Sequence, residues 1–143
     1  MVDDKNNGPE VEVEEVATEA VATAQVVEAV VKGKEIISYE DFAKLDIALG
    51  VITSVEVVEG ADKLLRLLVD IGEEEPRQIV SGIREYFDDV QSLVGKQCPF
   101  LVNLQPRTIR GLESQGMILA AERDGVFALL NPHNGLPAGT RVN

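Results

Sequence analysis

The sequence has 143 residues, 45% of them hydrophobic, and a formal net charge of −12 at pH 7. This length is about that of one domain, and no apolar run approaches the roughly 20 residues of a transmembrane helix. We therefore expect one soluble domain with no membrane segment. The chain does not open with a basic region followed by an apolar run, so the expected location is cytoplasmic.

Cysteine and histidine each occur once, as Cys98 and His133. No disulfide framework and no set of metal ligands follows from single residues of these types, so we expect neither a metal nor another cofactor. Cys98 lies in an apolar run and is expected to be a buried strand residue. His133 lies in a turn-forming sequence.

The negative charge argues against nucleic acid as a partner, because carboxylates repel phosphate. Residues 1–35 carry nine acidic and three basic side chains, and residues 36–143 carry sixteen and ten. Each part therefore contributes −6, and any nucleic-acid site must be a local basic patch.

A change of composition near Lys32 divides the chain into an acidic arm, residues 1–35, and a domain, residues 36–143. In the arm, small apolar residues recur at spacings of four and three, the period of a helix. Alanine buries little area and valine lowers helix propensity, so an isolated helix would be marginal. We expect a frayed helical or disordered arm. The alternative is a helix docked on a partner.

From Tyr39 onward, alternating apolar and β-branched residues predict strands. The first strand is expected to be bent or bulged at Gly50, and residues 86–93 are the one short helix expected in the domain. An Asp-Gly turn at residues 124–125 predicts a C-terminal hairpin. The predicted strands are residues 45–57, 64–71, 77–83, 97–102, 117–121 and 126–130. Short strands at this spacing predict an all-β fold built on a small closed or nearly closed barrel.

Seven motifs follow one another in the domain: DFAKLDIALGVI (41–52), ADKL (61–64), VDIG (69–72), RQIVSGI (77–83), LVGK (93–96), NLQPR (103–107) and GLESQGMILAA (111–121). This ordered set resembles the tRNA-binding domain family, found at the C-terminus of methionyl-tRNA synthetases and in free-standing tRNA-binding proteins. The resemblance implies a five-stranded oligonucleotide-binding barrel (OB-fold) with a C-terminal extension through which two copies pair. It also implies recognition of tRNA by shape. Aromatic residues are only 4% of the chain, which leaves few platforms for stacking single-stranded bases.

The chain departs from the family pattern at three positions. Gly60 stands where a polar residue such as asparagine is usual, Ala48 where arginine is usual, and Gln105 where lysine is usual. The last two changes each remove a positive charge, so we expect weaker or more salt-sensitive binding. An acidic surface adapted to a salty cytoplasm is the alternative explanation.

Seven polar residues are the candidate tRNA contacts: Lys63, Ser81, Asn103, Gln105, Arg107, Arg110 and Ser114. Arg107 and Arg110 lie three residues apart in a turn-rich segment, so one connecting loop is expected to present both guanidinium groups to adjacent phosphates. The alternative is a pair of solvated arginines that balance Glu113. Contacts to phosphate and ribose carry no base information, which agrees with recognition by shape.

The other candidates have alternatives too. Lys63 follows a turn and either faces the ligand or pairs with a neighbouring carboxylate. Asn103 either contacts the RNA or caps a turn. The Ser81-Gly82 pair is expected to mark a bend of the barrel, and Met117 is expected in the core.

The chain has no phosphate loop and no nucleophile with a paired base, so we expect a binding module and not an enzyme. The predicted function is structure-specific, sequence-nonspecific tRNA binding that assists aminoacylation. The chain would act as the C-terminal domain or beta subunit of a methionyl-tRNA synthetase, whose catalytic subunit would be a partner. The alternative is a peptide-binding export chaperone of the same fold.

Overall fold

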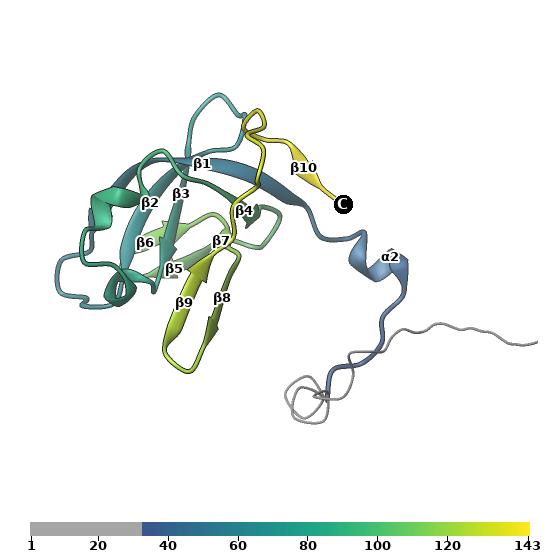
Figure 1. The fold of residues 1–143 in the computed structure, drawn as a ribbon, viewed down its shortest axis with the longest axis horizontal. Helices are drawn as coiled ribbons and strands as arrows, with labels where there is room; N and C mark the ends of the chain where they lie inside the picture. The colour runs from purple at the N-terminus through teal and green to yellow at the C-terminus, as the bar shows by residue number, and fades with distance from the viewer. Residues whose placement is uncertain (1–32) are drawn as a thin grey trace, which may run out of the picture. The chain divides into compact units, whose positions relative to one another are not determined.

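Short antiparallel strands dominate the computed structural model, which describes residues 33–143 (Figure 1). Residues 38–143 form one compact unit. Most of the predicted arm, residues 1–35, lies outside the described residues, so its helical or disordered character and its boundary at residue 36 stay predictions. No helix within residues 33–143 is long and apolar enough to cross a bilayer.

The strands are β1 (Ile47–Val57), β2 (Leu65–Asp70), β3 (Arg77–Ser81), β4 (Gln97–Leu101), β5 (Arg107–Ile109), β6 (Leu112–Ser114), β7 (Met117–Ile118), β8 (Ala120–Arg123), β9 (Val126–Leu129) and β10 (Arg141–Val142). A short helix, α2 (Tyr39–Phe42), precedes them and was not predicted. Ser38 caps this helix, because its side chain accepts a hydrogen bond from the backbone N–H of Asp41 at 3.1 Å.

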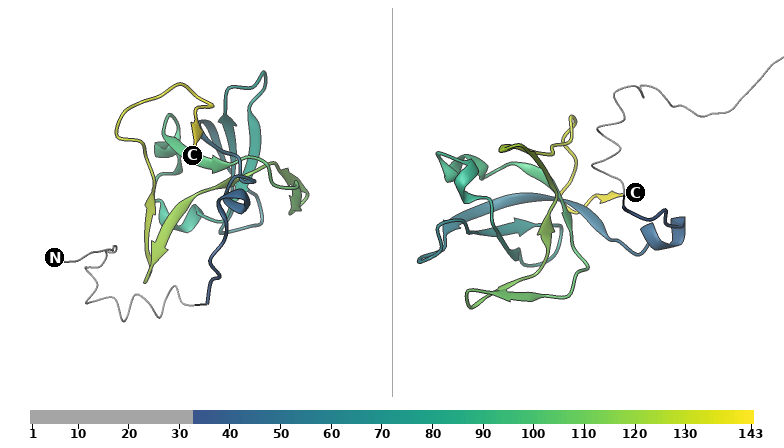
Figure 2. Two further views of the ribbon diagram at one scale, coloured as in Figure 1. Left: turned by 90° about the vertical axis from the view of Figure 1, so that its right-hand side faces the viewer. Right: turned by 90° about the horizontal axis from the view of Figure 1, so that it is seen from below.

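Five strands form the barrel in the order β3-β2-β1-β4-β7, and every pair is antiparallel (Figure 2). The two ends of this sheet approach each other through β3 and the segment after β6. There the backbone N–H of Gln115 donates to the carbonyl of Gln78 at 2.8 Å. The predicted all-β fold with a nearly closed five-stranded barrel is therefore confirmed.

The irregularity of β1 lies at Thr53, and the predicted bulge at Gly50 is wrong. The register against β2 shifts between Ile52 and Ser54, where the Thr53 hydroxyl donates to the carbonyl of Leu68 at 3.0 Å. Gly50 pairs regularly with Cys98 on β4. A Cβ at Gly50 would lie 2.6 Å from a methyl group of Val69, so glycine is needed there for close packing.

The predicted helix over residues 86–93 is replaced by two separate 3₁₀ turns, η1 (Arg84–Tyr86) and η2 (Val90–Leu93). Phe87 between them is extended, and the Asp89 side chain accepts a hydrogen bond from the N–H of Gln91 at 3.1 Å. Aspartate that bonds locally to the backbone starts a new turn and competes with a continuous helix. This pair of turns still occupies the predicted place between β3 and β4.

The largest fully buried side chains are Phe100, Ile52, Leu65, Leu67, Ile79, Leu93, Val69 and Cys98. Cys98 is therefore the buried strand residue that the sequence predicted, and burial raises the pKa of its thiol to about 11. Met117 is 44% exposed, so its predicted place in the core is wrong. Side chains alternate along a strand, and on β7 the neighbouring Ile118 takes the inward position.

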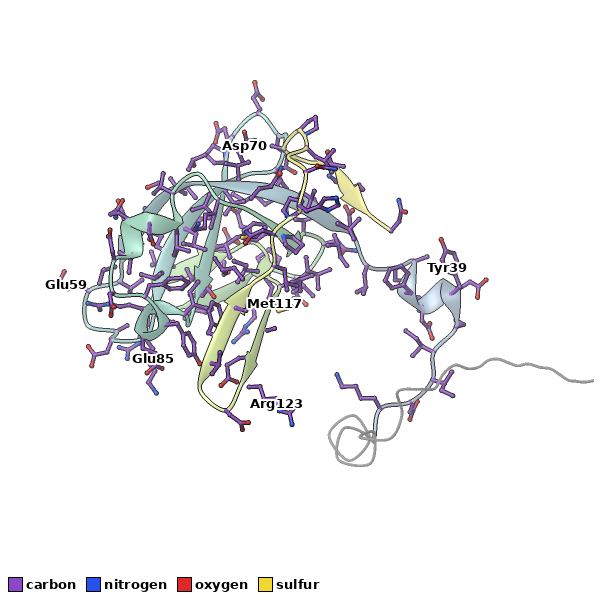
Figure 3. All side chains as sticks on the ribbon, in the orientation of Figure 1. Tyr39, Glu59, Asp70, Glu85, Met117 and Arg123 are labelled. Carbon is purple, nitrogen blue, oxygen red and sulfur yellow. The ribbon has the colours of Figure 1, made fainter. Side chains whose placement is uncertain are left out.

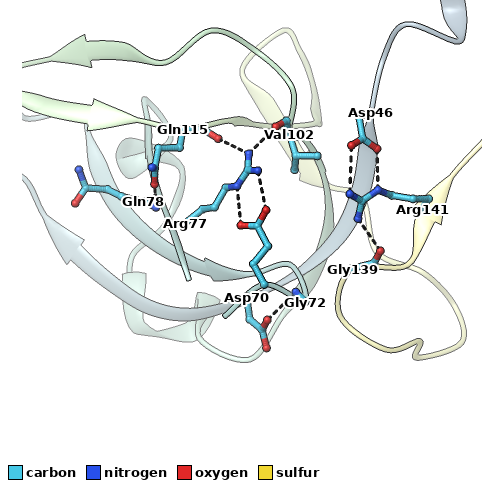
Figure 4. A network of polar contacts seen from close by, with 10 residues as sticks. Asp46, Asp70, Gly72, Arg77, Gln78, Val102, Gln115, Gly139 and Arg141 are labelled. Atoms are coloured by element: carbon cyan, nitrogen blue, oxygen red, sulfur yellow. Dashed lines mark hydrogen bonds and ion pairs between the residues drawn. The ribbon is translucent and has the colours of Figure 1, made fainter. Parts of the chain in front are cut away.

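The C-terminal part of the chain folds back on the barrel. The predicted hairpin forms from β8 and β9, and Phe127 of β9 stacks on Tyr86 with ring centroids 4.5 Å apart. His133 is exposed in a bend that follows. Strand β10 then pairs with the start of β1, where Arg141 binds Asp46 at 2.7 Å (Figure 4).

Candidate nucleic-acid interface

Lys63 and Arg110 come from distant parts of the sequence and line one shallow depression together with residues 60–62 and Leu64. Lys63 belongs to the loop between β1 and β2, and its carbonyl accepts a hydrogen bond from the N–H of Arg84 at 3.2 Å. The backbone of this loop is thus tied to η1 while the Lys63 side chain is exposed. No carboxylate of the described residues pairs with Lys63, so its amino group is available to a ligand.

Arg110 lies at the tip of the β5–β6 hairpin, which the sequence did not predict. Arg110 and Gly111 have φ of 53° and 81°, the arrangement of a tight two-residue hairpin turn. A positive φ is uncommon in a residue other than glycine, asparagine or aspartate, so Arg-Gly gives no strong turn signal. Such an unfavourable conformation often marks a functional position.

Arg107 lies at the base of the same hairpin, opposite Ser114. It borders a pocket of about 90 Å³ that Ser81, Gln105 and Ser114 also line, together with aliphatic side chains such as Leu104 and Ile109. The hairpin therefore places Arg107 beside one depression and Arg110 beside others with a different lining. The sequence predicted instead one connecting loop that presents both guanidinium groups to adjacent phosphates.

Ser114 and Asn103 already have partners within the domain. The Ser114 hydroxyl is buried, accepts from the N–H of Val80 at 3.0 Å and donates to the carbonyl of Gly116 at 3.2 Å. The Asn103 side chain accepts from the N–H of Asp46 at 2.9 Å and donates to the carbonyl of Lys44 at 2.7 Å. Both side chains hold backbone segments together. This geometry favours the structural alternative for Asn103.

Arg66 is a cation that the sequence analysis missed. Its Nε donates to Oε1 of Gln78 at 2.6 Å, and its Nη1 donates to Oε1 of Glu56 at 2.7 Å. Arg66 and Arg110 line a second depression, which Glu56, Glu59 and Gln78 also border. The sequence did indicate that Arg66 faces outward, because an arginine between two buried leucines, Leu65 and Leu67, takes the opposite side of an alternating strand.

Arg77, by contrast, is committed to the fold (Figure 4). It donates to the carbonyls of Val102 and Gln115, and it holds Glu73 at 2.9 Å. The hydrogen bond from Arg77 lowers the pKa of the Glu73 carboxyl. A third depression lies beyond the Asp70 end of β2 and is bordered by Glu73, Glu74 and Glu75. Figure 3 labels Asp70 at this end of β2, and Glu59 in the loop that precedes the other end. Lys63, Arg66 and Arg110 thus lie toward one end of β2, and the acidic loop lies beyond the other.

No group of three or more His, Cys, Asp or Glu side chains within residues 33–143 is placed to hold a metal ion.

The family described as "Putative tRNA binding domain" has a model that matches residues 47–141. The chain belongs to this tRNA-binding domain family. In OB-fold barrels generally, the face of the second and third strands and the loops after the first and fourth strands bind oligonucleotides. Lys63, Arg66 and Arg110 lie on those elements here.

Relatives of this chain carry the name methionine–tRNA ligase, among them proteins from two archaea. The protein from Methanosarcina mazei is 46% identical over 85% of this chain and 17% of its own length. The protein from Archaeoglobus fulgidus is 50% identical over 76% of this chain and 16% of its own length. The chain thus spans about a sixth of the length of these family members.

Two solved structures resemble the domain closely. A protein from Pyrococcus horikoshii, described as related to methionyl-tRNA synthetase (MetRS), has a TM-score of 0.70 and 35% identity, and the match covers 76% of this chain and 99% of that one. The chaperone CsaA from Bacillus anthracis has a TM-score of 0.68 and 29% identity, over 76% of this chain and 100% of that one.

Proposed function

We propose that this chain is a non-catalytic module that binds tRNA by its backbone and so assists aminoacylation. The observation that carries the proposal is the meeting of Lys63 and Arg110 from separate elements at the end of an OB-fold barrel where oligonucleotides bind. Arginine forks and lysine ammonium groups suit phosphate oxygens, and such contacts position RNA without reading bases. A cytoplasmic location belongs to the same proposal.

The match to methionine–tRNA ligases supports a role as the C-terminal domain or beta subunit of such an enzyme. Its contribution would be to hold the tRNA body and raise the effective concentration of tRNA at the catalytic subunit. The net charge of −12 opposes association at long range, so the intrinsic affinity is expected to be modest.

A peptide-binding chaperone is the second candidate, favoured by the likeness to CsaA from Bacillus anthracis. The pocket beside Arg107 is lined by aliphatic and by polar side chains. Such a lining suits an apolar side chain of an extended peptide as well as it suits ribose.

Filter binding of labelled total tRNA in the presence of an unfolded-peptide competitor separates the two candidates. We expect saturable retention of tRNA that the peptide does not displace, and similar affinities for different purified tRNAs. Retention should fall steeply with salt, because binding releases counterions from the RNA. Peptide binding with no retention of tRNA at low salt would replace the first candidate by the second.

We also propose that two copies pair through the C-terminal region, residues 126–142. Val126, Leu130, Leu136 and Val142 are 72%, 44%, 47% and 39% exposed. Exposed apolar surface that forms one patch marks a protein–protein contact, and pairing of two copies would cover these side chains. A symmetric pair would cover the same surface on both copies. Light scattering at micromolar concentration should give twice the chain mass of 15.5 kDa. A mass equal to one chain would contradict this prediction.

A further inference from the structure

Three cations and three carboxylates share the surface proposed to bind tRNA. Lys63, Arg66 and Arg110 line two depressions that share Arg110, and each comes from a different element. Asp62 borders the first depression, and Glu56 and Glu59 border the second. The formal charges of these six groups cancel. A phosphate arriving there therefore meets a surface of no net formal charge, on which Arg66 is paired with Glu56.

Arg66 is the cation of this cluster whose position is fixed by side-chain partners. Gln78 accepts from Nε at 2.6 Å, and Gln78 is itself held because its amide donates to the carbonyl of Glu113 at 2.9 Å. Glu56 accepts from Nη1 at 2.7 Å. Within residues 33–143, Nη2 of Arg66 has no acceptor. The guanidinium group is thus oriented before any ligand binds, which lowers the entropy lost on binding.

The Glu56–Arg66 ion pair is open to competition. The Arg66 side chain is 29% exposed and the Glu56 side chain is 59% exposed. Exposed pairs of this kind are weak, whereas a phosphate on a polyanion gains from released counterions when it meets the same guanidinium group. Gln78, being neutral, keeps its hydrogen bond to Nε after such an exchange.

We propose that Arg66 contacts a tRNA phosphate and that Glu56 is the carboxylate that this phosphate displaces. The inference rests on the proposed function and extends it. Glu56 then acts as a built-in competitor, which lowers the affinity for any single anion. Only a ligand with phosphates spaced to reach Lys63 and Arg110 as well gains enough to replace it.

The test uses the full chain and labelled total tRNA, with the variants Arg66→Gln, Glu56→Gln and the double variant, over a series of salt concentrations. Arg66→Gln should weaken binding about tenfold, since a hydrogen-bonded charge is lost. It should also flatten the dependence of log affinity on log salt by roughly 0.7–0.9. Glu56→Gln should tighten binding by up to about fivefold, because no ion pair has to be broken. In the Arg66→Gln background, Glu56→Gln should gain no more than Glu74→Gln does.

Glu74→Gln is the matched control, because it removes one negative charge beyond the opposite end of β2. Arg66→Lys is a second variant that keeps the charge and loses the guanidinium fork, so it should lower affinity while preserving the salt slope. Melting curves check that each variant is folded. Both partners of the pair are partly exposed, so we expect small shifts.

Two outcomes overturn the inference and leave tRNA binding intact. One is an unchanged affinity and salt slope in Arg66→Gln. The other is a gain from Glu56→Gln that equals the gain from Glu74→Gln, or that persists undiminished without Arg66, which would mean general repulsion. If the unaltered chain retains no tRNA at low salt, the proposed function and this inference fail together.

Discussion

Changing both Arg107 and Arg110 to glutamate should weaken tRNA binding by a factor of at least about a hundred. Each change removes a hydrogen-bonded positive charge, worth about 1.5–3 kcal/mol in a charge-assisted contact, and adds a repulsive carboxylate. The slope of log affinity against log salt should flatten by roughly 0.7–0.9 for each lost phosphate contact. The loss should be similar for different tRNAs, because phosphate contacts position RNA without reading its bases.

The single variants should differ in size. Arg110 borders both depressions that Lys63 and Arg66 line, whereas Arg107 borders the pocket with the aliphatic side chains. We therefore expect the larger loss from Arg110→Glu. Arg123→Glu, on the β8–β9 turn, is the control for a general charge effect, since Arg123 is 67% exposed and pairs only weakly with its neighbour Asp124 at 3.7 Å. A loss from Arg123→Glu as large as the loss from the Arg107/Arg110 pair would remove the β5–β6 hairpin from the interface.

Strands with regular alternation were predictable, and elements set by local polar bonding were not. The apolar alternation of residues 64–71 and 97–102 gave β2 and β4 to within one residue. The helix expected over residues 86–93 failed because the Asp89 carboxylate bonds to the N–H of Gln91 and begins a fresh turn. The β5–β6 hairpin was not predicted because its strands are only three residues long. Its turn also begins with Arg110, a residue type that is uncommon at positive φ.

The interface was harder to predict than the barrel, because it depends on how the barrel closes. The sequence indicated Lys63 after one turn and Arg110 in a separate turn-rich segment, but only the folded chain brings the two to one depression. The hydrogen bonds that Ser114 and Asn103 make within the domain were not predictable, because their partners, Val80 and Asp46, are remote in sequence. Arg66 was not among the predicted contacts because the predicted cations lie in turns, whereas Arg66 lies on β2, which with β3 forms the ligand-binding face of such barrels.

Gly139→Val should cost about 2–3 kcal/mol of unfolding free energy, seen as a fall in melting temperature of roughly 8–24 °C for a domain of this size. Gly139 has φ of 93°, a conformation that β-branched residues avoid, and a Cβ there would lie 2.5 Å from the carbonyl oxygen of Ile71. That oxygen belongs to the backbone and cannot move aside cheaply. Gly135→Val, in the same segment, is the control, because a Cβ at Gly135 meets nothing within 4 Å.

The loss should begin locally, where the C-terminal segment docks on β1. The N–H of Gly139 donates to the carbonyl of Leu49 at 2.7 Å, and the N–H of Leu49 donates to the carbonyl of Thr140 at 2.8 Å. In Gly139→Val, hydrogen exchange at the Leu49 amide should therefore accelerate more than exchange at the Ile52 amide, which bonds to Lys96 inside the barrel. The proposed pairing of two copies uses residues 126–142, so light scattering should show the variant shifting toward one chain before the barrel melts. Equal acceleration at Leu49 and Ile52 would mean that the C-terminal segment and the barrel unfold together. In that case the variant would have no folded single copy, and light scattering would show no shift toward the mass of one chain before melting.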